Sequence, residues 1–425
     1  MAMLNVTATS GAGLTRRLLP LRLAAFLQGV WLWVPVEKLF MTEIGFDAAT
    51  IGVMAAGYAA VVPLVEVVSG VLADRWSRRG VLAVSGVALL ASVLVGGLSR
   101  NVLTYIVAAL FLGIYIAMYS GTMEAVVYDT VLEETGSSEG YERQIGRVRL
   151  VESIGLVLSA FAGGWLAEVL SARLTYFVTL PFIVLALAAL ARFREPRLHE
   201  ASERSSLREH LRVTTHAILH RGRLVPIAAA SVMGGLILQA MFEFGPLWLI
   251  TLSASAVFYG PYWAGLVSTL GIGGLLAGRL RLDRRLPVAI VVAVMLAACL
   301  TMTSSRNLVV LTVAMIALTL LVVVAGIHVS RLMHDAVPSS IRTGVASGIG
   351  AVSWIFFMPF ALGFGAVSKR SGVYTSGWMI TAAVVLAGLA LLWVTLRPAH
   401  ELVLRTAPAA SVDPAEDGQD RREAA

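Results

Sequence analysis

The sequence is poor in charged residues and has almost no cysteine or lysine. Charged side chains make up 14% of the 425 residues, whereas a soluble globular chain carries about 25%. So low a fraction excludes an ordinary water-exposed surface. The single cysteine, Cys299, excludes an intrachain disulfide and a cysteine-ligated metal cluster. The only lysines are Lys38 and Lys369, so arginine supplies nearly all of the positive charge.

Motifs for nucleotide hydrolysis and for common catalytic sites are also missing. The sequence has no G-x-x-x-x-G-K-[ST] loop, so direct drive by ATP is not expected. It has neither a zinc motif nor a nucleophile elbow. We therefore expect no enzymatic activity, no cofactor and no metal.

Long apolar runs dominate what is present. Hydrophobic residues make up 58% of the chain, and the mean hydropathy is +0.81. A helix needs about 20 apolar residues to cross the hydrocarbon core of a bilayer. The runs predict an all-α integral membrane protein with twelve spans, at 20–41, 51–73, 81–98, 102–128, 146–169, 174–191, 225–250, 259–278, 287–304, 308–333, 345–367 and 375–395.

The polar segments between and after the spans indicate which side of the membrane each end of a span faces. Residues 192–224 form a basic connector, in which 206–224 could form an amphipathic helix on the membrane surface. Residues 398–425 read as a disordered tail. With both termini in the cytoplasm, 27 of the 33 Lys and Arg residues fall on the cytoplasmic side, as the positive-inside rule requires. We expect a multi-pass protein of the cell (inner) membrane.

Three pairs of matching segments indicate an internal repeat. The pairs are 28–35 with 239–246, 70–75 with 274–279, and 128–129 with 334–335. They predict two six-helix halves, residues 1–191 and 225–397, joined by the connector. Parallel repeats of this kind are a transporter architecture, with the substrate site between the halves near the middle of the membrane.

The loop after the second span carries a family resemblance. Residues 70–79 read GVLADRWSRR, which resembles the G-x-L-A-D-R-x-G-R-R signature of the major facilitator superfamily, with Ser77 in place of a glycine. The resemblance covers about residues 15–397 and implies the fold of that superfamily. It also implies a cytoplasmic gate, in which Arg78 pairs with Asp129 and Asp74 faces the start of the eleventh helix near Arg342. The gate residues would be Gly70, Asp74, Arg75, Arg78, Arg79, Asp129 and Arg342.

An alternative is that these charges only fix the topology at the membrane interface.

The fifth span adds a second resemblance, because residues 155–164 are similar to the family's antiporter motif, G-x-x-x-G-P-x-x-G-G, with the central Gly-Pro replaced. The matching residues are Gly155, Ser159, Gly163 and Gly164. Together with Glu66 and the Tyr128-Asp129 pair, they resemble a prokaryotic efflux-type subgroup.

Carboxylates inside apolar spans are costly and are therefore candidates for proton coupling or substrate binding. Glu243 in the seventh span is the foremost, either as a proton carrier, as an anchor for a cationic substrate, or as a carboxylate bonded to a neighbouring helix. Glu37 adjoins Lys38, and adjacent residues do not share a helix face, so both side chains could instead reach the outer interface. The remaining candidates are Glu66, Glu124 and Glu152; Glu152 could relay protons or pair with Arg149 and Arg147.

Aromatic and amide side chains gather in the first and seventh spans. The residues Gln28, Trp31, Trp33, Gln239, Phe242 and Phe244 occupy corresponding places in the repeat. Such a set would suit a cavity for lipophilic compounds, although aromatic residues also face lipid.

These features together favour a proton-coupled exporter of small lipophilic compounds that works by alternating access. A sugar or metabolite importer of the same fold and a non-transporting membrane receptor are the alternatives. We expect a small-molecule substrate, protons and membrane lipid as partners, no nucleic acid, and a monomer.

Overall fold

The structure is a computed structural model. It describes residues 3–137, 140–196, 224–277, 279–280, 282–337 and 342–396. Within these ranges, the side chains of residues 3–12, 67–68, 70–71, 73–75, 120, 342–344, 346–347 and 396 are not described. The predicted surface helix of the connector and the tail lie outside the described residues.

Of the residues that the structure describes, 88% are helical, which confirms the predicted all-α membrane fold. The helices are α1 (Met3–Gln28), η1 (Val34–Val36), α2 (Glu37–Glu43), α3 (Ala48–Arg75), α4 (Arg78–Leu98), α5 (Val102–Thr135), α6 (Tyr141–Val169), α7 (Ala172–Ala191), α9 (Leu224–Phe244), α10 (Pro246–Thr251), α11 (Ala256–Ala277), α12 (Arg285–Ser304), α13 (Leu308–Ala336), α14 (Arg342–Ser371) and α15 (Val373–Leu396). Among the described residues, 10 helices are long and apolar enough to cross a membrane. The other two crossings of the fold are α1 with η1 and α2, and α11.

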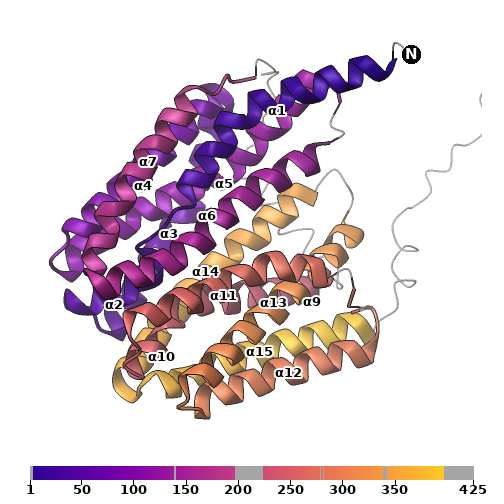
Figure 1. Ribbon diagram of the computed structural model, residues 1–425. Helices are drawn as coiled ribbons and strands as arrows, with labels where there is room; N and C mark the ends of the chain where they lie inside the picture. Colours follow the sequence, from indigo (N-terminus) through magenta and orange to yellow (C-terminus); the bar gives the residue numbers. More distant parts are fainter. Residues whose placement is uncertain are drawn as a thin grey trace, which may run out of the picture.

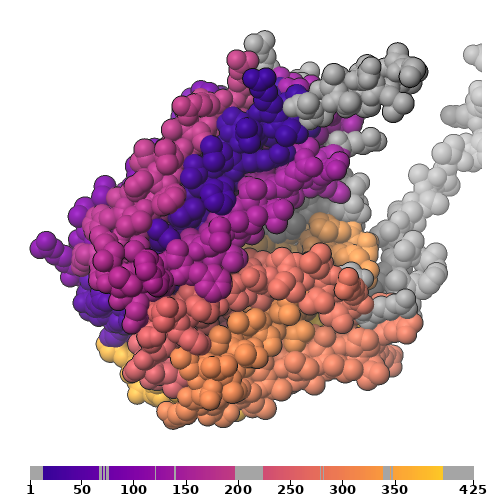
Figure 2. Space-filling model, in the orientation of Figure 1, coloured from indigo at the N-terminus to yellow at the C-terminus, as the bar shows by residue number. Residues whose placement is uncertain are grey.

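The helices form two bundles that lie against each other (Figure 1). We call α1–α7 the N-terminal half and α9–α15 the C-terminal half. The end of the molecule at which Asp47 precedes α3 is called the Asp47 end, and the end at which Arg78 begins α4 is called the Arg78 end. Figure 2 shows the halves in contact toward the end that carries α2 and α10, which is the Asp47 end, and hollowed between them toward the opposite end.

Two helix crossings join the halves near the Asp47 end, and both depend on glycine. At the crossing of α3 and α14, a Cβ atom on Gly52 would lie only 2.4 Å from the carbonyl oxygen of Ala361. At the crossing of α6 and α11, a Cβ on Gly164 would lie 2.8 Å from the amide nitrogen of Gly260. Only glycine allows the two backbones to approach this closely. These crossings therefore hold the halves together at one end.

The first and seventh spans, predicted at 20–41 and 225–250, are each broken in the middle. The chain is not regularly helical between the end of α1 at Gln28 and the start of η1, and α9 ends just before Pro246 begins α10. Proline has no N–H for the helical ladder. In addition, Gly29 packs so closely on α6 that a Cβ would lie 2.5 Å from the carbonyl oxygen of Glu152. Each break lies close to an ionisable side chain, Lys38 in one half and Glu243 in the other.

Candidate functional site

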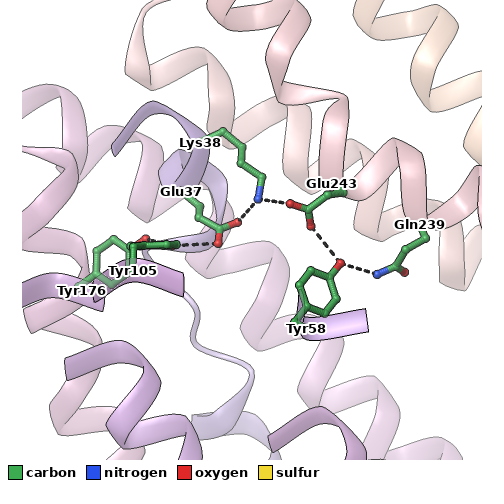
Figure 3. Close-up of polar contacts among 7 residues, drawn as sticks. All are labelled: Glu37, Lys38, Tyr58, Tyr105, Tyr176, Gln239 and Glu243. Atoms are coloured by element: carbon green, nitrogen blue, oxygen red, sulfur yellow. Dashed lines mark hydrogen bonds and ion pairs between the residues drawn. The ribbon is translucent and has the colours of Figure 1, made fainter. Parts of the chain in front are cut away.

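A buried ion-pair cluster connects the two halves. Lys38 is 2% exposed, and its Nζ donates to Glu37 Oε2 at 2.9 Å and to Glu243 Oε1 at 2.5 Å (Figure 3). Glu37 and Lys38 are the first two residues of α2, whereas Glu243 lies near the end of α9. The ammonium group therefore binds one carboxylate of its own half and one of the opposite half.

Neutral side chains extend this cluster on the Glu243 side. The hydroxyl of Tyr58 on α3 donates to Glu243 Oε2 at 3.0 Å. Gln239, four residues before Glu243 on α9, donates from Nε2 to the Tyr58 hydroxyl at 2.8 Å. Glu243 thus receives two hydrogen bonds from the N-terminal half, and both depend on the halves being in contact.

The cluster also continues into the N-terminal half. The hydroxyl of Tyr105 on α5 donates to Glu37 Oε1 at 2.9 Å, and the hydroxyls of Tyr105 and Tyr176 lie 2.7 Å apart. We call the seven residues Tyr176, Tyr105, Glu37, Lys38, Glu243, Tyr58 and Gln239 the polar chain (Figure 3). Both of its carboxylates are hydrogen-bonded, as a buried polar network requires for stability.

The polar chain contains two carboxylates but one ammonium group. When all three groups are ionised, the cluster carries one net negative charge in a site from which water is largely excluded. A proton on Glu243 would leave Glu37 and Lys38 as a neutral pair within one half. The arrangement can therefore hold or release one proton without leaving Lys38 unpaired.

The alternative in which Glu37 and Lys38 reach the outer interface does not hold, because both side chains take part in the polar chain. Adjacent side chains diverge in a regular helix, but Glu37 is the first residue of α2 and follows the short η1 turn. The four-carbon stem of Lys38 is flexible enough to bring its ammonium group back to Glu37. A charge that is paired in this way can remain buried.

A cavity of about 240 Å³ lies between the halves and is lined by apolar and aromatic side chains. Trp31 lines it from the N-terminal half, and Phe242 and Trp263 line it from the C-terminal half. No charged side chain is among its lining residues, and the hydroxyl of the lining residue Ser159 is bonded to the carbonyl oxygen of Leu156 at 3.0 Å. One residue that lines the cavity, Phe242, directly precedes Glu243 of the polar chain in the sequence.

Three of the six residues predicted to line a cavity are packed elsewhere. Trp33 stacks on Tyr176 with 5.1 Å between ring centroids, and Phe244 stacks on Phe364 at 4.4 Å. Gln28 is buried within the N-terminal half. Of the other three, Trp31 and Phe242 line the cavity, and Gln239 joins the polar chain.

At the Arg78 end, the structure brings together part of the predicted gate. Arg78 forms an ion pair with Asp129, as the resemblance implied, and donates to the carbonyl oxygen of Ala125 at 3.0 Å. Arg79 donates to the carbonyl oxygen of Phe193 at 3.1 Å. The side chains of Asp74, Arg75 and Arg342 lie outside the described residues, and Gly70 lies within α3.

The other candidate carboxylates lie apart from the polar chain. Arg149 binds Glu124 at 2.9 Å and Glu152 at 3.3 Å. These contacts place Arg149, rather than Arg147, between the two carboxylates. Glu66 is exposed on α3, and the described part of the chain shows no partner for its carboxylate.

The residues of the antiporter-like motif serve helix packing. A Cβ on Gly155 would lie 2.6 Å from the carbonyl oxygen of Phe26, and one on Gly163 would lie 2.0 Å from that of Leu32. Ser159 Oγ lies 3.5 Å from the carbonyl oxygen of Gly29. One face of α6 therefore fits against the first span, while Gly164 contacts α11.

Sequence reasoning missed most of the partners of Glu243 and Glu37. Lys38 had a visible signal, because it is one of two lysines and adjoins an apolar span. Tyr58, Tyr105 and Tyr176 had none, since an aromatic residue in a span is equally suited to lipid contact or packing. The same holds for Trp263, which lines the cavity.

Comparison with known proteins adds a family and several relatives. The model of the Major Facilitator Superfamily matches residues 19–353. Multidrug resistance protein 1 of Bacillus subtilis is 27% identical over 173 residues, which are 40% of this chain and 43% of that protein. The match therefore spans less than half of that relative's length.

Solved transporter structures resemble the whole fold. A mutant of the nucleoside transporter NupG gives a TM-score of 0.75 at 15% identity, over 89% of this chain and 99% of that one. A bacterial homologue of the human lysosomal transporter Spinster, in an inward-facing and unoccupied conformation, gives 0.70 at 14% identity, over 90% and 97%. The D-xylose-proton symporter gives 0.69 at 13% identity, over 88% and 96%. At such identities the likeness establishes the fold alone.

Proposed function

Because this chain belongs to the Major Facilitator Superfamily of membrane transporters, we propose that it is a proton-coupled exporter of small lipophilic compounds. In this proposal, the two halves rock about the central cavity, and Glu243 carries the proton. The observation that carries the proposal is the Lys38–Glu243 ion pair, which joins the halves at a buried position.

The ion pair makes separation of the halves depend on protonation. If the halves separated at the Asp47 end while Glu243 was ionised, its carboxylate would lose both Lys38 and Tyr58. An unpaired buried charge costs several kcal/mol. After protonation, Glu243 is neutral, and Lys38 keeps Glu37 as its partner at 2.9 Å. Each half then carries no unpaired buried charge, so opening at the Asp47 end is favoured by proton uptake.

The direction of exchange follows from the orientation that the positive charges favour. The Arg78 end is placed in the cytoplasm, because most Lys and Arg residues lie there in the predicted topology. The Asp47 end then faces outward and is closed in this structure. Protons would bind Glu243 from outside while the halves are apart at the Asp47 end, and Lys38 would displace them toward the cytoplasmic end when the halves close there. Compounds would enter the cavity from the cytoplasmic end.

The cavity supports a lipophilic substrate. Its lining is aromatic and aliphatic and has no charged group, so a polar sugar would lose hydrogen bonds to water without replacement. The partial match to a protein named for multidrug resistance agrees with this choice of substrate.

Proton flux in proteoliposomes tests the proposal. A pH-sensitive dye would be enclosed, a pH gradient imposed, and a panel of lipophilic cations, neutral antibiotics and sugars added. We expect a lipophilic compound to dissipate the gradient with the native protein and not with Glu243→Gln. Glu43→Gln, at an exposed carboxylate of the same end, is the matched control and should behave as the native protein. Transport without proton movement, or an unchanged Glu243→Gln variant, would reject the assignment.

A further inference from the structure

A groove on the outside of the N-terminal half is separate from the cavity between the halves. It runs between α4 and α7, which lie side by side (Figure 1), and has a volume of about 490 Å³. Its walls include Trp76, Val84, Val87 and Leu187. Trp76 is 58% exposed and Val87 is 55% exposed. We call this feature the α4–α7 groove.

The α4–α7 groove has a basic end. Arg79 lines it, is exposed, and uses Nη1 to bind the carbonyl oxygen of Phe193. The described residues show no partner for its other terminal nitrogen. Arg192 and Arg194 are exposed just after the end of α7. Three guanidinium groups therefore belong to the segments at this end, while the walls along α4 and α7 are apolar.

One carboxylate also lies at this end, and its position limits where an anion can bind. Glu195 accepts hydrogen bonds from the Ser77 hydroxyl and from the Arg78 N–H, both at 2.6 Å. It therefore already occupies the N-terminus of α4, the usual anion position of a helix. An additional anion would bind the outward side of Arg79 instead.

From this arrangement we infer that the α4–α7 groove binds an anionic phospholipid, with its phosphate at Arg79 and an acyl chain along Val84, Val87 and Leu187. An acyl chain suits the walls because they are apolar and face the membrane. A phosphate suits the end because guanidinium groups bind phosphate oxygens through paired N–H groups. Trp76 has the amphipathic ring that is common at the headgroup level of a bilayer. The three arginines outweigh Glu195, so an anionic headgroup is favoured over a zwitterionic one.

Native mass spectrometry of the purified full chain would test this inference. The probes are phosphatidylglycerol and phosphatidylcholine with identical acyl chains, together with glycerol 3-phosphate as the free headgroup. We expect phosphatidylglycerol to bind at least tenfold more tightly than phosphatidylcholine, and glycerol 3-phosphate to bind far more weakly than the lipid. Equal binding of the two lipids would overturn the inference. Equal binding of glycerol 3-phosphate and phosphatidylglycerol would also overturn it, because the site would then be one for free phosphate.

Two variants test the contribution of the charge at Arg79 and the contribution of the apolar groove separately. Arg79→Gln should abolish the preference for phosphatidylglycerol, whereas Arg100→Gln, at an exposed arginine of the opposite end, should preserve it. Ala83→Phe would place a ring in the groove and should weaken binding of the lipid with all charges intact. Retention of the preference in Arg79→Gln, or unchanged lipid binding in a folded Ala83→Phe protein, would contradict the assignment.

Discussion

Replacement of Lys38 by methionine should destabilise the protein more than any other single change in the polar chain. Lys38→Met keeps most of the side-chain volume but removes the ammonium group that two carboxylates share at 2.9 and 2.5 Å. Removal of one partner from a buried ion pair costs about 3–5 kcal/mol. Both Glu37 and Glu243 lose their counter-ion in this variant, so we expect the upper part of that range at neutral pH.

Glu243→Gln should cost much less. Lys38 then keeps Glu37 as its partner, and the glutamine can still hydrogen-bond Lys38 and Tyr58. The net value of a neutral hydrogen bond is about 1 kcal/mol, and we expect a loss of that order. The double variant Lys38→Met/Glu243→Gln should be more stable than Lys38→Met alone, because it leaves one unpaired carboxylate instead of two.

The buried thiol of Cys299 provides the assay. It is the only cysteine in the chain and is 1% exposed, so a thiol-reactive fluorogenic dye reports unfolding as temperature rises. The deficit of Lys38→Met should shrink as pH is lowered, because a protonated carboxyl group needs no counter-ion. Equal losses in the two single variants, or a double variant that shows their sum, would refute the pairing described above.

Three further outcomes are expected. Phe244→Ala should lower stability by about 3–5 kcal/mol, since the ring is fully buried, whereas Phe242→Ala should reduce transport with a smaller change in melting temperature. Gly163→Ala should prevent stable folding, because its Cβ would lie 2.0 Å from a backbone oxygen. The hydrogen bond from Lys369 lowers the pKa of Asp47 to about 2, so the contribution of this pair is complete above the unfolded pKa near 4 and is lost only as the pH falls toward 2. Because both side chains are well exposed, Asp47→Asn should cost at most about 1 kcal/mol, with no change between pH 5 and 8.

Gly163→Ala has a control in the same chain, and the other outcomes have results that would contradict them. Gly121→Ala should fold normally, because the added Cβ would meet no atom within 4 Å beyond its chain neighbours and its own helix backbone. If Phe242→Ala proved as destabilising as Phe244→Ala, the cavity would not be where we place it. A strong effect of Asp47→Asn on stability would mean that the exposed pair, rather than Lys38 and Glu243, holds the halves together.

The fold could be predicted from the sequence to within a few residues at most helix ends. Apolar runs separated by polar turns determine where helices can cross a bilayer, and the repeat determines how the two halves correspond. The breaks in the first and seventh spans were missed because a hydropathy run does not register a local change of backbone direction. Phe242 and Phe244 lie two positions apart on α9 and therefore on different faces, so Phe242 lines the cavity while Phe244 packs in the interior.

The polar chain could be predicted only in part. Glu243 stood out because an isolated carboxylate in an apolar span is costly. Its pairing with Lys38 joins residues 205 positions apart, and no local pattern indicates which side chain of the other half will meet it. The Arg78–Asp129 pair could be predicted because the family resemblance implies both partners. The spacing of the two residues in the sequence does not indicate that they meet.

The distance between the halves at the Asp47 end, measured as a function of pH, tests the central claim most directly. Spin labels at Arg100→Cys and Ser304→Cys, both exposed and in different halves, would be introduced in a Cys299→Ala background. We expect short distances at alkaline pH, a growing long-distance population at acidic pH, and long distances at every pH when Glu243→Gln is added. Distances that do not respond to pH, or a Glu243→Gln protein that stays closed, would contradict the proposal that protonation of Glu243 releases the two halves.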